Sequence, residues 1–127
     1  MEDQFKHGQF NWCELLTTDV AAAKAFYTKL FGWETEDMSM PGMDYTVVKA
    51  GGEGIGGIMK IPEGAKGMPP QWGAYVTVDD VDKTAEMAGK LGGKVHVPPT
   101  DIPTVGRFCV IVDPQGAAIN AITYLKR

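Results

Sequence analysis

An internal repeat is the feature of this sequence that most restricts its fold. When the chain is displaced by 61 positions along itself, five identical residues coincide. The matched residues are Asp19, Val20, Lys29, Leu30 and Gly32, which fall on Asp80, Val81, Lys90, Leu91 and Gly93. In both copies a strand-like run leads into Asp-Val, a helical stretch, a glycine and a further strand-like run. This repeated order of patterns predicts two modules with the same supersecondary structure.

Each module is predicted to have the order β-α-β-β-β. Short apolar runs between Gly and Pro turn signals predict eight strands, at residues 10–17, 33–38, 45–49, 55–61, 72–78, 94–97, 106–112 and 117–124. Two helices are expected, one ending near residue 31 after a cap at Thr18 or Asp19, and one at 81–91 after Asp79 or Asp80. Pro98 and Pro99 are expected to end the sixth strand.

The domain prediction follows from these elements. Residues 1–127 are interpreted as a single domain in which module 8–61 and module 71–125 are joined by a Pro/Gly linker at 62–70. One helix covers only one face of each sheet, so the other face needs a second cover. We therefore expect an α+β fold with two tandem β-α-β-β-β modules, whose curved sheets pair around a cavity.

Two local patterns in the first module carry further expectations. Val20, Ala23, Phe26, Tyr27 and Leu30 recur at three-to-four spacing, which predicts one apolar helix face buried in the core. The glycine-rich segment 51–57 lacks the Lys-Ser/Thr ending of a phosphate-binding loop and is interpreted as a flexible hairpin.

Charge and cysteine content limit the possible partners. A formal net charge of −4 with no basic cluster argues against nucleic acid. No apolar stretch is long enough to span a membrane and the start lacks an export signal, so we expect a soluble cytoplasmic protein. Cys13 and Cys109 lie in apolar strand-like runs and are interpreted as buried thiols. His7 and His96 are interpreted as solvated.

Several strings of this sequence resemble the vicinal oxygen chelate superfamily, which contains glyoxalase I, extradiol dioxygenases, and bleomycin and fosfomycin resistance proteins. The strings are Asp19-Val20, Ala25-Phe26-Tyr27-Thr28-Lys29-Leu30-Phe31-Gly32-Trp33, Val78-Asp79-Asp80-Val81, Leu91-Gly92-Gly93 and Asp113-Pro114-Gln115-Gly116. The resemblance extends over residues 10–124 and implies the paired-module fold, a small-molecule ligand and a homodimer.

The resemblance also implies positions for a divalent metal. Members of the superfamily hold it with His, Gln and Glu on the first and last strands of each module. The corresponding positions here are Trp12, Gly73 and Asn120, with the fourth near Ile58 or Met59. None is a usual ligand, and a catalytic metal generally needs at least three protein ligands. We therefore expect no catalytic metal and no other cofactor.

Strand parity extends the register to a candidate binding site, since alternate side chains share a face. The predicted ligand-binding residues are Trp12, Glu14, Tyr75, Thr77, Phe108, Asn120 and Ile122. Glu14 is the candidate catalytic base, or an anchor for a cationic or hydroxylated ligand. The competing interpretation is that Glu14 has a structural role. It would then pair with Arg107 or a backbone amide, or lie at a solvent-exposed edge of the sheet.

Three function classes follow. The first is a glyoxalase/bleomycin-resistance-like protein that binds a small aromatic or amphipathic molecule without a catalytic metal. The alternative is a lactoylglutathione-lyase-like or dioxygenase-like enzyme with an atypical metal site or with Glu14 as base. The third is a structural or regulatory module without a pocket. The altered metal positions favour binding over classical metal-dependent catalysis.

Overall fold

The computed structural model describes residues 6–40, 43–62 and 67–125. Its contacts divide the chain into two compact units. The first unit is Trp12–Gly73, and the second unit contains the described residues 6–11 and 74–125. Of the predicted linker 62–70, residues 63–66 lie outside the described residues. The single-domain organisation stays a prediction.

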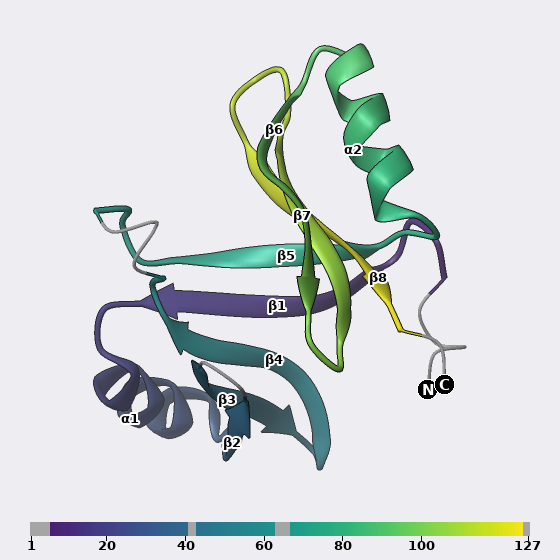
Figure 1. The fold of residues 1–127 in the computed structure, drawn as a ribbon. Helices are drawn as coiled ribbons and strands as arrows, with labels where there is room; N and C mark the ends of the chain where they lie inside the picture. Colours follow the sequence, from purple (N-terminus) through teal and green to yellow (C-terminus); the bar gives the residue numbers. More distant parts are fainter. Residues whose placement is uncertain (1–5, 41–42, 63–66, 126–127) are drawn as a thin grey trace. The chain divides into compact units, whose positions relative to one another are not determined.

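The described residues form eight strands and two helices in the predicted order, so the α+β class with tandem β-α-β-β-β modules is confirmed (Figure 1). The elements are β1 (Phe10–Thr17), α1 (Val20–Phe31), β2 (Glu34–Met40), β3 (Met43–Ala50), β4 (Glu53–Lys60), β5 (Gln71–Thr77), α2 (Val81–Lys90), β6 (Lys94–Ile102), β7 (Gly106–Val112) and β8 (Ala118–Tyr124).

Both helices begin and end as the local sequence predicts. The Asp19 side chain accepts a hydrogen bond from the backbone N–H of Ala22, and the Asp80 side chain accepts from Asp82 and Lys83. Gly32 ends α1 in the left-handed region, with φ of 73°. A residue without Cβ adopts that conformation without steric cost, which explains the helix stop.

In the first unit the strand order is β2-β3-β4-β1, with α1 on one face. β1 runs parallel to β4, while the other neighbours are antiparallel. Leu15, Val48 and Ile58 form the buried core under the helix, and Val20, Ala23 and Tyr27 of α1 pack against it.

The predicted helix face is wrong at two positions of α1. Phe26 and Leu30 are 59% and 56% exposed, and the helix contains no buried residue. The two side chains lie to one side of the Val20, Ala23 and Tyr27 stripe that contacts the core.

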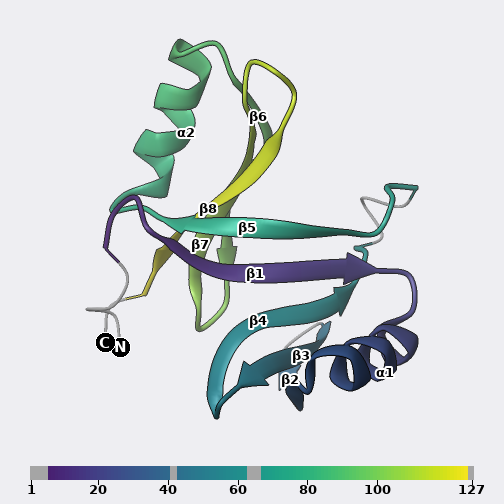
Figure 2. The same cartoon turned by 180° about the vertical axis from the view of Figure 1, so that it is seen from behind.

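In the second unit the strand order is β5-β8-β7-β6, and Figure 2 shows α2 alongside these strands. Val81 and Ala85 of α2 are buried against Cys109, Ala121 and Val78. β6 continues to Ile102, past the prolines that were expected to end it. Irregularities in the β6–β7 register between Val95 and Thr100 accommodate these residues.

The division between the units falls inside β1 and β5, so residues 10–11 belong to the second unit and residues 71–73 to the first. Thr77 receives a hydrogen bond from the backbone N–H of Gly8 and donates its own N–H to the carbonyl of Gln9. These bonds place Gly8 and Gln9 in the second unit.

Candidate functional site

The helix-free face of the first unit carries two of the predicted site residues. In the register of β3, β4 and β1, Gly57 pairs with Val47 on one side and with Glu14 on the other. Directly paired residues share a face, and so do residues two positions apart on one strand. Trp12, Glu14 and Tyr45 therefore lie on the face opposite the α1 core.

A chain of hydrogen bonds joins these three side chains. The Trp12 indole Nε1–H donates to the Tyr45 hydroxyl oxygen over 2.8 Å, and the Tyr45 hydroxyl donates to Glu14 Oε2 over 2.7 Å. All three are partly buried. This chain of hydrogen bonds holds the Glu14 carboxyl group next to the Trp12 indole ring and the Tyr45 phenol ring.

The donors determine the direction of this chain. An indole nitrogen only donates, so the Tyr45 oxygen accepts from it and the phenolic proton points to Glu14. Glu14 Oε2 is therefore the acceptor of this hydrogen bond. A carboxyl oxygen can also accept from an ammonium or hydroxyl group of a ligand.

Gly57 on β4 provides the space for the Tyr45 ring. A Cβ at Gly57 would lie 1.8 Å from the Tyr45 hydroxyl oxygen, whereas a Cβ at Gly54 would be in ordinary contact with the Trp12 ring at 3.7 Å. Gly51 and Gly52 form the turn of the predicted hairpin, and residues from Glu53 onward belong to β4, which pairs with β3.

The other five predicted ligand-binding residues lie in the second unit. Thr77 pairs with Ile122 and Ile122 with Phe108, while Tyr75 pairs with Asn120. These pairings place all five on one face, opposite the core formed with α2. Asn120 donates its side-chain N–H to the Ala74 carbonyl over 3.2 Å. The prediction that they contact a ligand together with Trp12 and Glu14 stays a prediction.

Asn11 forms a polar network in the second unit. Its amide nitrogen donates to Thr77 Oγ1, and its amide oxygen accepts from the Tyr124 hydroxyl over 2.8 Å. The three side chains come from β1, β5 and β8. This network orients Thr77, one of the predicted ligand-binding residues.

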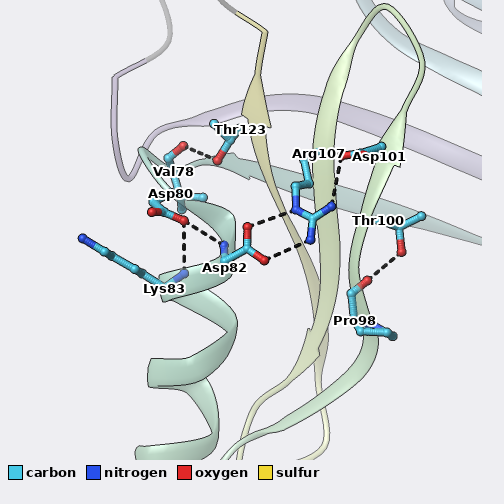
Figure 3. Close-up of polar contacts among 9 residues, drawn as sticks. All are labelled: Val78, Asp80, Asp82, Lys83, Pro98, Thr100, Asp101, Arg107 and Thr123. Carbon is cyan, nitrogen blue, oxygen red and sulfur yellow. Dashed lines mark hydrogen bonds and ion pairs between the residues drawn. The ribbon is translucent and has the colours of Figure 1, made fainter.

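Arg107 has structural partners within the second unit, and the interpretation that pairs it with Glu14 stays a prediction. Its Nε and Nη2 each donate to an Asp82 carboxylate oxygen over 3.0 Å, and Nη1 donates to Asp101 over 3.0 Å (Figure 3). These bonds raise the pKa of Arg107 and lower the pKa of Asp82. They join the start of α2 to β6 and β7.

Two surface cavities lie in the second unit, away from the predicted site residues. One of about 250 Å³ is lined by Asp80, Asp101 and Arg107 among others. The other, of about 570 Å³, lies along α2 and includes His7 and Met87. His7 Nδ1 accepts from the Asp79 N–H over 2.9 Å, so its imidazole has a structural contact as well as solvent.

The positions that correspond to a metal site do not fit a divalent ion. The Trp12 N–H is donated to Tyr45, Gly73 has no side chain, and the Ile58 side chain is in the apolar core. Asn120 contributes at most an amide oxygen. Among the described residues, no group of three or more His, Cys, Asp or Glu could hold a metal ion. The expected absence of a catalytic metal stays a prediction.

Sequence reasoning missed Tyr45 and Asn11. Tyr45 lies 31 positions from Glu14, so its contact depends on the β3–β4–β1 register rather than on a local motif. The available signal was an aromatic hydroxyl on a strand that precedes a glycine-rich strand. Asn11 has the opposite strand parity from Trp12, so the parity argument does not include it.

The chain belongs to the Glyoxalase/Bleomycin resistance protein/Dioxygenase superfamily, whose family model matches residues 9–121. The fold agrees with this assignment. The methylmalonyl-CoA epimerase of Mycobacterium tuberculosis superposes with a TM-score of 0.66 at 14% identity, covering 94% of this chain and 89% of the epimerase.

Two longer proteins are similar in sequence. A protein of Mycobacterium tuberculosis (strain CDC 1551 / Oshkosh) named "Putative glyoxylase CFP32" is 44% identical over 120 residues, covering 92% of this chain. The "Anthracycline biosynthesis protein DnrV" of Streptomyces peucetius is 34% identical over 128 residues, covering 91% of this chain. The match covers 46% of each relative, so this chain spans about half their length. Neither described helix is long and apolar enough to cross a membrane.

Proposed function

We propose that this chain binds a small aromatic or amphipathic molecule without a catalytic metal. The observation that supports this function is the hydrogen-bonded chain of Trp12, Tyr45 and Glu14 on the helix-free face of the first unit. An indole ring offers a stacking surface, and the adjacent carboxylate orients a donor group of the ligand.

The second unit contributes a comparable set of side chains. Tyr75 and Phe108 carry aromatic rings, and Thr77 and Asn120 carry polar groups, on the same face, where Tyr75 and Thr77 are each 8% exposed. Ile122 supplies an apolar contact. We infer that these residues bind the apolar body and polar substituents of the ligand. We further propose that the protein acts as a homodimer. We also propose that it acts in the cytoplasm, since two free cysteines suit a reducing compartment.

An anthracycline is the first ligand to test, because a relative is named for anthracycline biosynthesis and such molecules are planar and amphipathic. Binding of daunorubicin is measured by thermal shift and by quenching of its fluorescence. A ligand at 100 times its Kd adds about 2.7 kcal/mol of stability, which produces a clear rise in Tm.

Two substitutions test the site. Glu14→Gln and Tyr45→Phe are expected to weaken binding by about tenfold or more, because each removes a polar group from the chain. Glu53→Gln is the matched control, since Glu53 is an exposed carboxylate at the start of β4 in the same unit. Equal affinities for the Glu14 and Glu53 variants would exclude Glu14 as the anchor. A panel of planar aromatic amines and phenols, each without a Tm shift, would reject small-molecule binding.

The alternative function is a lactoylglutathione-lyase-like or dioxygenase-like enzyme with Glu14 as base or with an atypical metal site. The name of the 44% identical relative supports it. Turnover of a hemithioacetal and of a catechol is measured with and without added divalent metal, together with the metal content of the purified protein. Turnover with stoichiometric metal supports the enzyme. Turnover without metal that is lost in the Glu14→Gln variant supports Glu14 as the base.

A further inference from the structure

An exposed apolar surface lies on α1 and the start of β5 in the first unit. Phe26, Leu30 and Phe31 are 59%, 56% and 58% exposed, and Trp72 is 39% exposed. We call these four residues the aromatic surface. Exposed apolar patches of this kind usually mark a site of interaction.

Ring contacts make this surface continuous. Tyr27 lies at its centre, with ring centroids 5.0 Å from Phe26, 6.1 Å from Phe31 and 5.4 Å from Trp72. Trp33 packs between Phe31 and Trp72 at 5.0 Å and 6.0 Å. The Trp72 indole also donates to the Tyr27 hydroxyl over 3.2 Å. The exposed rings are thus held by their neighbours in a fixed arrangement.

The internal repeat shows that Phe31 is not needed for the supersecondary structure. At a displacement of 61 positions it corresponds to Gly92 of the second module, which forms the same β-α-β-β-β structure. Tyr27 and Trp33 pack against the core of the first unit, whereas Phe31 is 58% exposed. A requirement other than the fold therefore accounts for Phe31.

The exposed area suits the centre of a protein interface. An aromatic side chain buries about 150–250 Å² when fully covered, so the exposed fractions leave on the order of 400 Å² of the aromatic surface open. A standard interface buries about 800 Å² per partner, with an apolar centre and a polar rim. The aromatic surface would supply about half of that area as its centre.

Charges of both signs adjoin the surface. Lys29 precedes Leu30, and Glu34 follows Trp33. Both are exposed, and neither forms an ion pair with another residue in the described part of the chain. A two-fold contact places each surface against a copy of itself, so a surface with both signs can be complementary to itself. This property favours a second copy over a partner of a single charge.

The length of the two relatives supports a partner that is about as large as this chain. In both, the segment that matches this chain makes up 46% of the protein, so about as much chain again accompanies it. A second copy of this chain would supply an equivalent amount of protein.

We propose that the aromatic surface is the docking site for a second copy of this chain, in a two-fold symmetric dimer. The inference rests on the proposed homodimer and specifies the surface that forms it. Phe26, Leu30 and Phe31 pack across the interface, and Lys29 and Glu34 of one copy face the opposite charges of the other.

The repeat supplies a matched pair of variants to test this surface. Phe26→Glu/Leu30→Glu places two charges four residues apart on α1. Met87→Glu/Leu91→Glu makes the same change at the equivalent positions of the second module, where Met87 and Leu91 are 51% and 71% exposed. Sedimentation over a dilution series gives the mass of each protein, and circular dichroism checks folding. The wild type and the Met87/Leu91 variant are expected at twice the 13.7 kDa chain mass, and the Phe26/Leu30 variant at the chain mass.

The outcomes separate the two proposals. A wild type that is monomeric at every concentration overturns both the homodimer and this surface. A Phe26/Leu30 variant that remains dimeric, or a Met87/Leu91 variant that dissociates equally, overturns the surface alone. If the Phe26/Leu30 variant does not fold, hydrogen exchange of the wild type decides. Amides of residues 24–34 are expected to exchange more slowly as concentration rises while those of 85–95 do not, and equal behaviour of the two segments overturns the proposal.

Discussion

The Arg107 guanidinium holds the Asp82 carboxylate by two parallel hydrogen bonds of 3.0 Å, from β7 to the first turn of α2. Such a bidentate pair fixes the orientation of both side chains. Asp101 on β6 completes the arrangement with a third bond of 3.0 Å. The pair therefore connects the helix of the second unit to two strands that lie later in the sequence.

Asp82→Asn is expected to lower the Tm at neutral pH, with an effect that depends on pH. Hydrogen bonds from Arg107 lower the pKa of Asp82 from its ordinary value of 3.8. Its contribution to stability is therefore present above pH 3.8 and lost as pH falls through the lower folded pKa. The difference in Tm between wild type and variant should be constant from pH 7 to 5 and shrink below pH 4.

Differential scanning calorimetry across this pH range measures the effect. Because the Arg107 side chain is 38% and the Asp82 side chain 58% exposed, the change is small, as expected for a surface ion pair. Asp44→Asn is the control, since Asp44 is exposed and forms no ion pair with another described residue. A pH-independent difference for Asp82→Asn would contradict the assignment.

Gly57→Ala should disrupt the Trp12–Tyr45–Glu14 chain. The added methyl group would lie 1.8 Å from the Tyr45 hydroxyl oxygen, so the phenol ring must move. The expected loss in the free energy of unfolding is roughly 1–3 kcal/mol, typical of overpacking. Urea denaturation measures the loss, and the affinity for daunorubicin should fall with it.

Gly89→Ala is the control for the glycine substitution. A Cβ at Gly89 meets no atom within 4 Å, and its position in α2 favours alanine. This variant is expected to gain about 0.4–1 kcal/mol of stability. Similar losses for the two variants would show that Gly57 is not constrained by Tyr45.

The two cysteines should differ in reactivity, because Cys13 is exposed and Cys109 is completely buried. The prediction that both are buried thiols is thus wrong for Cys13. Burial raises the pKa of the Cys109 thiol, with a smaller effect of the Asp82 charge, so its thiolate is scarce. Labelling with a disulfide reagent is expected to modify one thiol at least about tenfold faster than the other. Peptide mapping should identify Cys13 as the fast site. Equal labelling in the folded protein would contradict the burial of Cys109.

The helix caps of the two modules should be equivalent. Asp19 and Asp80 occupy the same repeat position, where Asp19 accepts one backbone N–H of the first turn and Asp80 accepts two. Asp19→Ala and Asp80→Ala are each expected to lower the free energy of unfolding by about 1 kcal/mol. Asp44→Ala should leave it nearly unchanged. Unequal losses in the free energy of unfolding would mean that the two caps are not equivalent, because contacts around one helix change what its cap contributes.

Local chemistry explains which parts of the fold could be predicted from the sequence. The caps at Asp19 and Asp80 and the stop at Gly32 depend on groups within a few residues, so their signals are visible in the sequence. The end of β6 could not be predicted from the sequence, because Pro98 and Pro99 are expected to end a strand. Irregular pairing with β7 allows the strand to continue through them.

The candidate site was predictable only as a set of strand faces. Parity correctly grouped Trp12 with Glu14, and Tyr75 with Thr77, because side-chain alternation is a local property. The contact of Tyr45 with Glu14 depends on pairing between β3, β4 and β1, and on the absence of a side chain at Gly57. The exposed face of α1 was also missed, since periodicity marks apolar residues without stating what covers them.

The division of β1 between the two units has a consequence for synthesis on the ribosome. Asn11 is made 113 residues before Tyr124, from which it accepts a hydrogen bond. Thr77 must also be present before Gly8 and Gln9 have their backbone partners. The second unit therefore cannot close around residues 8–11 until β8 has been translated, while the first unit has all its residues as soon as Gly73 has been added.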